Sequence, residues 1–512
     1  MPAFIDASHS IDITLIDTLL SDDNAILKAI SEQFSTGVEE LKSLVLDGAV
    51  LFCPTSMGKD STSVCLMALE AYRQLISEGA IAPSHPLIFS TVNTGMEQSP
   101  MNLYVAYAKK RVETYAAAYQ INLQYQIVKP ALNDQYFVRF VGGQKLLSHP
   151  SRNGDCSIIL KVKPSEAYVK SLASQYSTLT GNTKIVTCLG SRLAEGTRRA
   201  GNMAGQGISH KSIEDLKTEL TEVTVGQATI YNFAPIRNWS VDDVFNLLRI
   251  AGSKPLSKVP GVAIPAFLDD FGLLIAIYGN GSNETCSVAI GQQTTGAGCN
   301  GKARFGCIAC TQVGQTDNSS TALTRLTRWN VLGTESALRV RDYMYRLAGD
   351  MNARAYHARA YDPTGFSRVA MQPNILKPAH LEKIVRYAAQ LTLDAYRIAS
   401  EFNSLVAQGR ELEHPGMQCI ANDESLNPKT KRAMLQMYRE GVQNPENLNT
   451  IFTLEHAALL SYRWAVDGIA AAPFRPLAIY KQLEAGKGWL PYPPLNSELA
   501  ARGLDAKPKS SE

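Results

Sequence analysis

The chain has 512 residues, of which 45% are hydrophobic, and its 50 basic and 47 acidic residues leave a net charge of +3. This length predicts two or three domains with a large core. The near balance of charge is typical of an ordinary soluble protein. It neither indicates nor excludes nucleic acid as a partner, because such binding depends on local basic patches.

The N-terminal segment has no basic region of the kind that begins a secretory signal. No apolar run reaches the length of a membrane span, so we expect a cytoplasmic protein without membrane association. The nine cysteines are therefore not expected to form a disulfide framework. Four of them lie in apolar runs and are expected to be buried in the core: Cys53, Cys65, Cys188 and Cys419.

The spacing of apolar residues predicts alternating helices and strands. Helical spacing covers 11–45, 60–78 and 100–119, and short apolar runs predict strands at 49–53, 86–92, 121–128, 185–190 and 228–234. This alternation predicts an α/β fold, a parallel sheet covered on both faces with its ligand site at the carboxyl ends of the strands. We expect Trp239 in the core and Ser240 as the N-cap of the next helix.

The pattern changes at about residue 251, where a Gly- and Cys-rich stretch precedes a mostly helical region. We expect five segments: an N-terminal helical segment (1–44), the α/β domain (45–250), a Cys-rich metal-binding segment (251–320), a helical C-terminal region (321–490) and a loose tail (491–512).

A candidate phosphate-binding loop, with the sequence Ser-Met-Gly-Lys-Asp-Ser-Thr, occupies residues 56–62 between a predicted strand and a predicted helix. Gly58 permits a tight turn, and backbone amides at a helix N-terminus attract phosphate. Lys59 adds positive charge, and Asp60 is expected to hold a Mg²⁺ ion. The loop also offers three hydroxyl donors: Ser56, Ser61 and Thr62. It is not a Walker A loop, because Cys53 replaces the first glycine of that motif.

Two later polar segments are expected to complete the nucleotide site. The first follows the second strand and would contact the base or ribose through Asn93, Thr94 and Gly95. The second begins at Gly190 and carries Arg192, Arg198 and Arg199, which would neutralise the triphosphate as pyrophosphate leaves. The alternative for the second segment is a solvated basic turn.

Residues 56–62 resemble the S-G-G-K-D-S/T loop of PP-loop ATP pyrophosphatases. Met57 replaces a glycine of that motif, so its side chain must point away from the phosphates. Residues 189–199 resemble the G-x-R-x-x-E-S-x-x-R segment of the same superfamily, and 235–245 resemble the segment that closes its domain. The resemblance implies cleavage of ATP between the α and β phosphates, with Mg²⁺.

A cluster of four cysteines follows in C-x12-C-x7-C-x2-C spacing: Cys286, Cys299, Cys307 and Cys310. Four thiolates fit structural zinc or a [4Fe–4S] cluster, and spacing alone does not decide between them. The remaining alternative is a set of free buried thiols.

A PP-loop domain followed by Arg-Phe-Gly-Cys-x-x-Cys resembles the DndC-like and SspD-like ATP pyrophosphatases of DNA phosphorothioation, an anti-phage defence system. The resemblance covers residues 45–315 in motifs. It implies a [4Fe–4S] cluster rather than zinc, a DNA backbone phosphate as substrate, and as partners a cysteine desulfurase and other phosphorothioation proteins. Three alternatives stay open: a tRNA-thiolation enzyme, an ATP-liganded DNA-binding scaffold, and a phosphoadenylylsulfate reductase, which is disfavoured because no cysteine follows Cys419.

Cys156 precedes Lys161 and Lys163 in a segment that resembles the family's W-C-T-x-x-L-K motif, although Asp155 replaces the aromatic residue. The lysines would favour a thiolate able to carry persulfide sulfur. The alternative is a structural thiol that lines the site.

An arginine-rich stretch, residues 325–368, contains eight arginines, four acids and interleaved aromatic residues. Arginine binds phosphate and aromatic rings stack on bases, so this stretch is a candidate DNA surface, with Arg339, Arg341 and Arg346 as contacts. The alternative is a packed helical domain whose arginines pair with acids.

We predict that protein purified anaerobically is brown and contains about four irons per chain, as a [4Fe–4S] cluster requires. Serine at any one of Cys286, Cys299, Cys307 or Cys310 should bleach the protein. Metal analysis and the visible absorption spectrum measure both effects. One zinc per chain with no iron would contradict the prediction.

Overall fold

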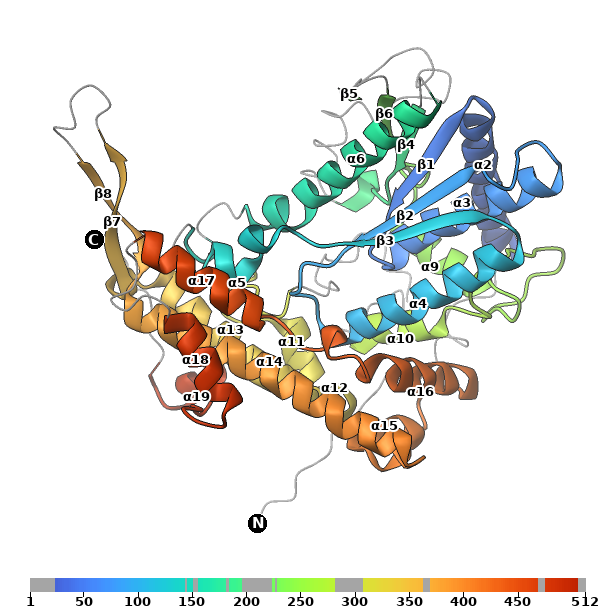
Figure 1. Cartoon of the computed structure of the whole chain (residues 1–512). Coiled ribbons are helices and arrows are strands. Elements are labelled where there is room, and N and C mark those ends of the chain that lie inside the picture. The colour runs from blue at the N-terminus through green and yellow to red at the C-terminus, as the bar shows by residue number, and fades with distance from the viewer. Residues whose placement is uncertain are drawn as a thin grey trace.

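A computed structural model describes residues 24–142, 145–150, 155–180, 184–195, 223–225, 228–280, 307–361, 369–467 and 475–504. A six-stranded sheet organises the N-terminal half, in the order β3-β2-β1-β4-β6-β5 (Figure 1). Its strands are β1 (Ala49–Pro54), β2 (Pro86–Val92), β3 (Asn122–Val128), β4 (Lys184–Cys188), β5 (Val223–Val225) and β6 (Ala228–Phe233). Five of these strands run parallel, and β5 pairs antiparallel with β6 at the edge.

Helices cover both faces of the sheet. Leu51 and Cys53 of β1 pack on one face, with residues of α2 (Asn24–Leu46), α3 (Lys59–Ser77), α4 (Ser99–Ala118) and α9 (Val241–Ile250). Val50 and Phe52 pack on the other face, with α6 (Lys163–Thr180). Because each face of β1 is buried, its sequence is apolar throughout rather than alternating. The predicted α/β fold is confirmed; the expected helical stretch before Asn24 lies outside the described residues.

The start of α9 is fixed by a capping box. The Ser240 hydroxyl accepts from the Asp243 N–H at 3.0 Å, and the Asp243 carboxylate accepts from the Ser240 N–H at 2.7 Å. Trp239, immediately before it, is 5% exposed. Both predictions for this segment are confirmed, since a Ser-x-x-Asp capping signature is a local property of the sequence.

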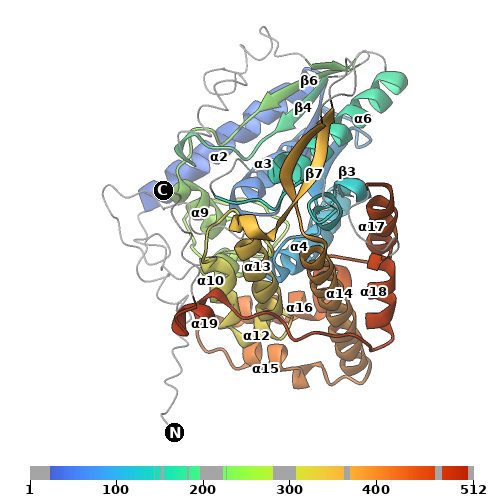
Figure 2. The same cartoon turned by 90° about the vertical axis from the view of Figure 1, so that its left-hand side faces the viewer.

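The C-terminal region is mostly helical and packs on the sheet domain. Its helices are α11 (Asn318–Thr324), α12 (Thr327–Asn330), α13 (Thr334–Gly349), α14 (Pro378–Ala407), α15 (Pro415–Ala421), α16 (Pro428–Val442), α17 (Leu454–Asp467), α18 (Arg475–Glu484) and α19 (Asn496–Ala501). Helix α16 lies against α4, where Arg111 donates to both carboxylate oxygens of Glu440 at 2.7 and 2.9 Å. Helix α18 packs against both α14 and α17 (Figure 2).

Shorter helices occur in both parts of the chain and between them. They are α5 (Tyr136–Arg139), α10 (Gly272–Asn280), the π-helix η2 (Ile158–Val162), and the 3₁₀ helices η1 (Leu132–Asp134), η3 (Leu193–Glu195), η4 (Met351–Ala353), η5 (Glu411–Glu413) and η6 (Pro445–Asn447). A second apolar core joins α5 to α13, α14, α17 and α18. Across the described ranges, no helix combines the length and apolar character needed to cross a membrane.

An antiparallel hairpin interrupts the helical region and was not expected. Strands β7 (Arg354–Tyr361) and β8 (Val369–Leu376) pair with each other and extend away from the helices (Figure 1). The alanines and arginines of β7 favour helix in isolation, so the pairing with β8 overrides local propensity.

Two expectations for the C-terminal half are wrong. The expected loose tail is ordered as far as Leu504: the Tyr492 hydroxyl donates to Asp394 at 2.9 Å, and the Asn496 N–H donates to Asp342 at 2.7 Å. Cys419 is only half-buried, on the short helix α15. The other three thiols expected in the core, Cys53, Cys65 and Cys188, are buried there.

The three arginines proposed as DNA contacts have partners within the protein, and Arg341, which is fully buried, does not reach a surface where DNA could bind. Arg341 is fully buried and donates to the carbonyl oxygens of residues 310, 314 and 315, beside its ion pair with Asp342. Arg339 pairs with Glu335 and Glu498, and Arg346 donates to Asn496 at 2.7 Å. Helix α13 is therefore packed within the protein, and its arginines pair with acids or backbone carbonyls, as the alternative interpretation of the arginine-rich stretch predicts.

We predict that Arg341→Ala lowers the free energy of unfolding by about 3–5 kcal/mol, because it leaves Asp342 as a buried charge without its partner. Urea denaturation measures the change. Arg325→Ala, at an exposed position of the same stretch, should change it by less than about 0.5 kcal/mol. Unchanged stability of Arg341→Ala together with weaker DNA binding would restore the DNA-surface interpretation.

Candidate active site

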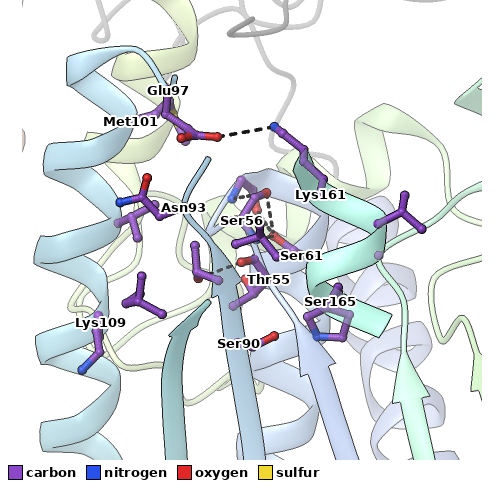
Figure 3. A pocket seen from close by; sticks show the side chains of 18 of the residues that line it. Thr55, Ser56, Ser61, Ser90, Asn93, Glu97, Met101, Lys109, Lys161 and Ser165 are labelled. Carbon is purple, nitrogen blue, oxygen red and sulfur yellow. Dashed lines mark hydrogen bonds and ion pairs between the residues drawn. The ribbon is translucent and has the colours of Figure 1, made fainter. Parts of the chain in front are cut away.

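A cavity of about 1280 Å³ lies at the carboxyl ends of β1, β2, β4 and β6 (Figure 3). Parallel α/β sheets place their ligand sites at this edge, because the connecting loops meet there. Pockets for one small molecule are typically about 300–1,000 Å³, so this cavity has room for a nucleotide and part of a second substrate.

The phosphate loop forms one wall of the cavity. Four successive backbone N–H groups, from Ser56 to Lys59, each donate to a hydroxyl oxygen. The pairs are Ser56 N–H with Ser61 Oγ (3.3 Å), Met57 N–H with Thr55 Oγ1 (3.0 Å), Gly58 N–H with Ser56 Oγ (3.3 Å) and Lys59 N–H with the Tyr278 hydroxyl (3.3 Å). Such a run of amides at a helix N-terminus binds anions, so phosphate oxygens are the natural charged replacements for these hydroxyls.

Met57 takes the conformation that the motif needs. Its φ is +52°, in the left-handed region that favours glycine, and its side chain is fully buried in the core beneath the loop. The expectation that Met57 points away from the phosphates is confirmed. Burial of the methionine side chain offsets the backbone cost.

Charged side chains of the loop form a chain of ion pairs. One carboxylate oxygen of Asp60 contacts Lys59 Nζ at 2.5 Å, and the other contacts Arg192 Nε at 2.6 Å. Lys59 and Asp60 line the cavity, as expected. Each oxygen of Asp60 already has a cationic partner, so a Mg²⁺ ion at Asp60 would take the place of Lys59.

Arg192 has a different position from the one expected. It is 1% exposed and is not among the residues that line the cavity. Its guanidinium holds Asp60 and also donates to the Trp239 carbonyl at 3.4 Å. Arg192 therefore acts on the phosphate loop through Asp60, rather than by direct contact with a triphosphate.

The remaining predicted site residues divide into three groups. Those that line the cavity are Ser56, Gly58, Ser61, Asn93 and Gly190. Those that do not line it are Thr62 and Thr94, which are buried, and Gly95, which is exposed on the turn held by a 2.8 Å hydrogen bond from Thr94 to Glu97. Arg198 and Arg199 lie outside the described residues.

The rim of the cavity carries an ion pair and a thiol. Lys161 and Glu97 extend toward each other from opposite sides, 3.6 Å apart (Figure 3). Cys307 also lines the cavity, next to Glu97 in an antiparallel bridge where the Ile308 N–H donates to the Met96 carbonyl at 2.7 Å. Burial raises the pKa of Cys307 to about 12, although Lys161 acts in the opposite direction. The unliganded thiol is therefore protonated at neutral pH.

Cys156, distant in sequence, lies beside this rim. It is near enough to Cys307, Cys310 and Lys161 to interact with them electrostatically. Desolvation lowers the pKa of Lys161, but the Cys307 thiolate, when it is ionised, and the Glu97 carboxylate act in the opposite direction, so the pKa is raised overall and the ammonium stays charged. One thiol, Cys307, and one cation, Lys161, thus line this side of the cavity, with Cys156 and Cys310 nearby.

The described cysteines fit part of the predicted metal site. Cys307 and Cys310 lie on one turn, in which the Cys310 N–H donates to the Cys307 carbonyl at 3.0 Å, the arrangement that a C-x-x-C chelate needs. Cys286 and Cys299 fall outside the described residues. Within the described ranges, no three His, Cys, Asp or Glu side chains are grouped to hold a metal ion.

Residues 50–256 match the sequence model of one family, the phosphoadenosine phosphosulfate reductase domain. This part of the chain is therefore similar to a phosphoadenosine phosphosulfate reductase domain. The match supports the PP-loop superfamily, and with it an enzyme that uses an adenine nucleotide in sulfur-related chemistry. A comparison with curated proteins and one with solved structures each give no match.

One residue of the cavity, Tyr278, was not identified from the sequence. Tyr278 lines the cavity and contacts the phosphate loop from α10, 219 positions after Lys59. It lies beyond the segment that matches the family, in an apolar helix with no motif around it. Only the packing of α10 against the sheet domain brings it to the site.

Proposed function

We propose that the protein is an ATP pyrophosphatase that adenylylates a DNA backbone phosphate, so that sulfur can replace one of its oxygens. This reaction would serve DNA phosphorothioate modification in an anti-phage defence system. One observation carries the proposal: a phosphate loop with four successive amides that donate to hydroxyl oxygens borders a cavity larger than one nucleotide needs, with the Cys307 thiol at its rim.

In the first step, a non-bridging oxygen of the DNA phosphate attacks the α-phosphorus of ATP, and pyrophosphate leaves. The loop amides and Lys59 hold the β and γ phosphates and stabilise the charge that develops on the leaving group. The loop also fixes the α-phosphorus for attack from the open side of the cavity. A Mg²⁺ ion, when bound at Asp60, would neutralise part of the same charge.

In the second step, sulfur attacks the activated DNA phosphorus and displaces AMP. A persulfide on Cys156, loaded by a cysteine desulfurase, would supply the sulfur from the rim. The product of that attack is a sulfur–sulfur bond between the cysteine and the phosphorothioate. A thiol reductant then cleaves this bond, which releases phosphorothioate DNA and returns the cysteine thiol. Lys161, beside Cys156, would stabilise the thiolate.

The proposed [4Fe–4S] cluster on the four clustered cysteines would lie next to this rim, because Cys307 is part of it. DNA and the other phosphorothioation proteins are the remaining proposed partners. Since the arginines of α13 are engaged within the protein, DNA would be held at the cavity mouth, on another surface or by a partner subunit.

The alternatives predict different products. A phosphoadenylylsulfate reductase needs a redox-active cysteine near its C-terminus; the last cysteine here, Cys419, lies on α15 and does not line the cavity. Such an enzyme, like an ATP-liganded scaffold, would release no pyrophosphate from ATP. A tRNA-thiolation enzyme would release it with tRNA, but not with DNA, as the stimulating polymer.

We predict that Lys59→Ala lowers the rate of pyrophosphate release from ATP by about 10²- to 10³-fold, the usual effect of removing one electrostatic contact to a transition state. An enzyme-coupled pyrophosphate assay with DNA present measures the rate. The matched control is Lys28→Ala, at an exposed position on α2, which should retain the wild-type rate. A wild-type rate in Lys59→Ala would remove the phosphate loop from the chemistry.

A further inference from the structure

Tyr278 reaches the phosphate loop from a separate helix. Its hydroxyl accepts from the Lys59 N–H at 3.3 Å, and a Cβ atom placed on Gly58 would lie 2.7 Å from it. Its ring packs edge-on against Phe245, with centroids 6.4 Å apart. The hydroxyl is thus held at the helix N-terminus, where the positive end of the helix dipole faces the cavity.

The hydroxyl accepts from an amide that would otherwise be available to a phosphate oxygen. The other three amides of the run donate to hydroxyls of the loop itself, at Thr55, Ser56 and Ser61. Those side chains belong to the segment that a phosphate would reorganise, whereas Tyr278 is anchored on α10. When a phosphate oxygen takes over the Lys59 N–H, the phenol remains next to that oxygen. A phenol can donate as well as accept, so it becomes a donor to the phosphate.

We propose that Tyr278 is a phosphate-binding residue, whose hydroxyl donates to the phosphoryl oxygen held by the Lys59 N–H. The ligand class is an organic di- or triphosphate, or pyrophosphate itself. The inference rests on the proposed function only in that the loop binds a polyphosphate. It adds a residue from outside the family-matched segment 50–256 to the nucleotide site.

A purely structural role for the hydroxyl makes a different prediction. If it only satisfied the Lys59 amide in the unliganded loop, its removal would leave that N–H without an acceptor. Phosphate binding would then relieve the defect, and affinity would rise. A hydroxyl that donates to the bound phosphate has the opposite effect, because a hydrogen bond to a charged group is lost.

The test is isothermal titration calorimetry of the full-length Tyr278→Phe variant with ATP, inorganic pyrophosphate and AMP, each with Mg²⁺. The phenylalanine ring preserves the contact with Phe245. We expect affinity for ATP and pyrophosphate to fall about tenfold, the effect of one charged hydrogen bond, with affinity for AMP unchanged. The matched control is Tyr104→Phe, which removes a buried hydroxyl that does not line the cavity and should leave all three affinities unchanged.

Unchanged or tighter binding of ATP and pyrophosphate by Tyr278→Phe would overturn the assignment. An equal loss for AMP would also overturn it, since that outcome indicates a distorted loop. A wild-type protein that binds neither ATP nor pyrophosphate would overturn both proposals. If wild-type protein binds pyrophosphate, Tyr278→Phe loses that affinity, and ATP yields no pyrophosphate, then Tyr278 keeps its role and the proposed pyrophosphatase activity fails.

Discussion

The ion pair between Asp60 and Arg192 fixes the geometry on which the rest of the site depends. Asp60 lies in the first turn of α3, and Arg192 lies in the connection after β4, with its guanidinium buried and also bonded to the Trp239 carbonyl. The segments that follow β1, β4 and β6 are therefore joined at the carboxyl edge of the sheet by these contacts. The pair ties the phosphate loop to the connections after β4 and β6 without help from a ligand.

In the phosphate loop, each backbone N–H from Ser56 to Lys59 donates to a neutral hydroxyl. The carboxylate of Asp60 is paired with the side chains of Lys59 and Arg192. An incoming polyphosphate has to exchange these partners for phosphate oxygens, and it does not have to build the loop. The Cys307 thiol lies on another side of the same cavity, where Lys161 and Glu97 meet. In the proposed reaction, nucleotide phosphates at the loop and sulfur at the rim would leave the space between them for the group that is to be modified.

Local signals in the sequence predicted the parts of this arrangement that depend on neighbouring residues. The strand–loop–helix context of the phosphate loop, the cap at Ser240 and the inward direction of Met57 are of this kind. Contacts between distant segments were not predictable in the same way: Tyr278 reaches the loop through packing, and the β7–β8 hairpin forms against local propensity. Arg341 was misplaced by its composition. The arginine-rich stretch around it indicated an exposed surface, but three backbone carbonyls and Asp342 hold Arg341 in the interior.

In the proposed reaction, an oxygen of the DNA phosphate attacks ATP and leaves with AMP. DNA labelled with ¹⁸O at its non-bridging phosphate oxygens, incubated with the protein, ATP, a cysteine desulfurase and a thiol reductant, tests this directly by mass spectrometry of the AMP. If the DNA oxygen forms the adenylylated intermediate and sulfur then displaces AMP, the AMP carries one ¹⁸O atom. AMP that carries no ¹⁸O, while the label stays in the DNA, would contradict the account.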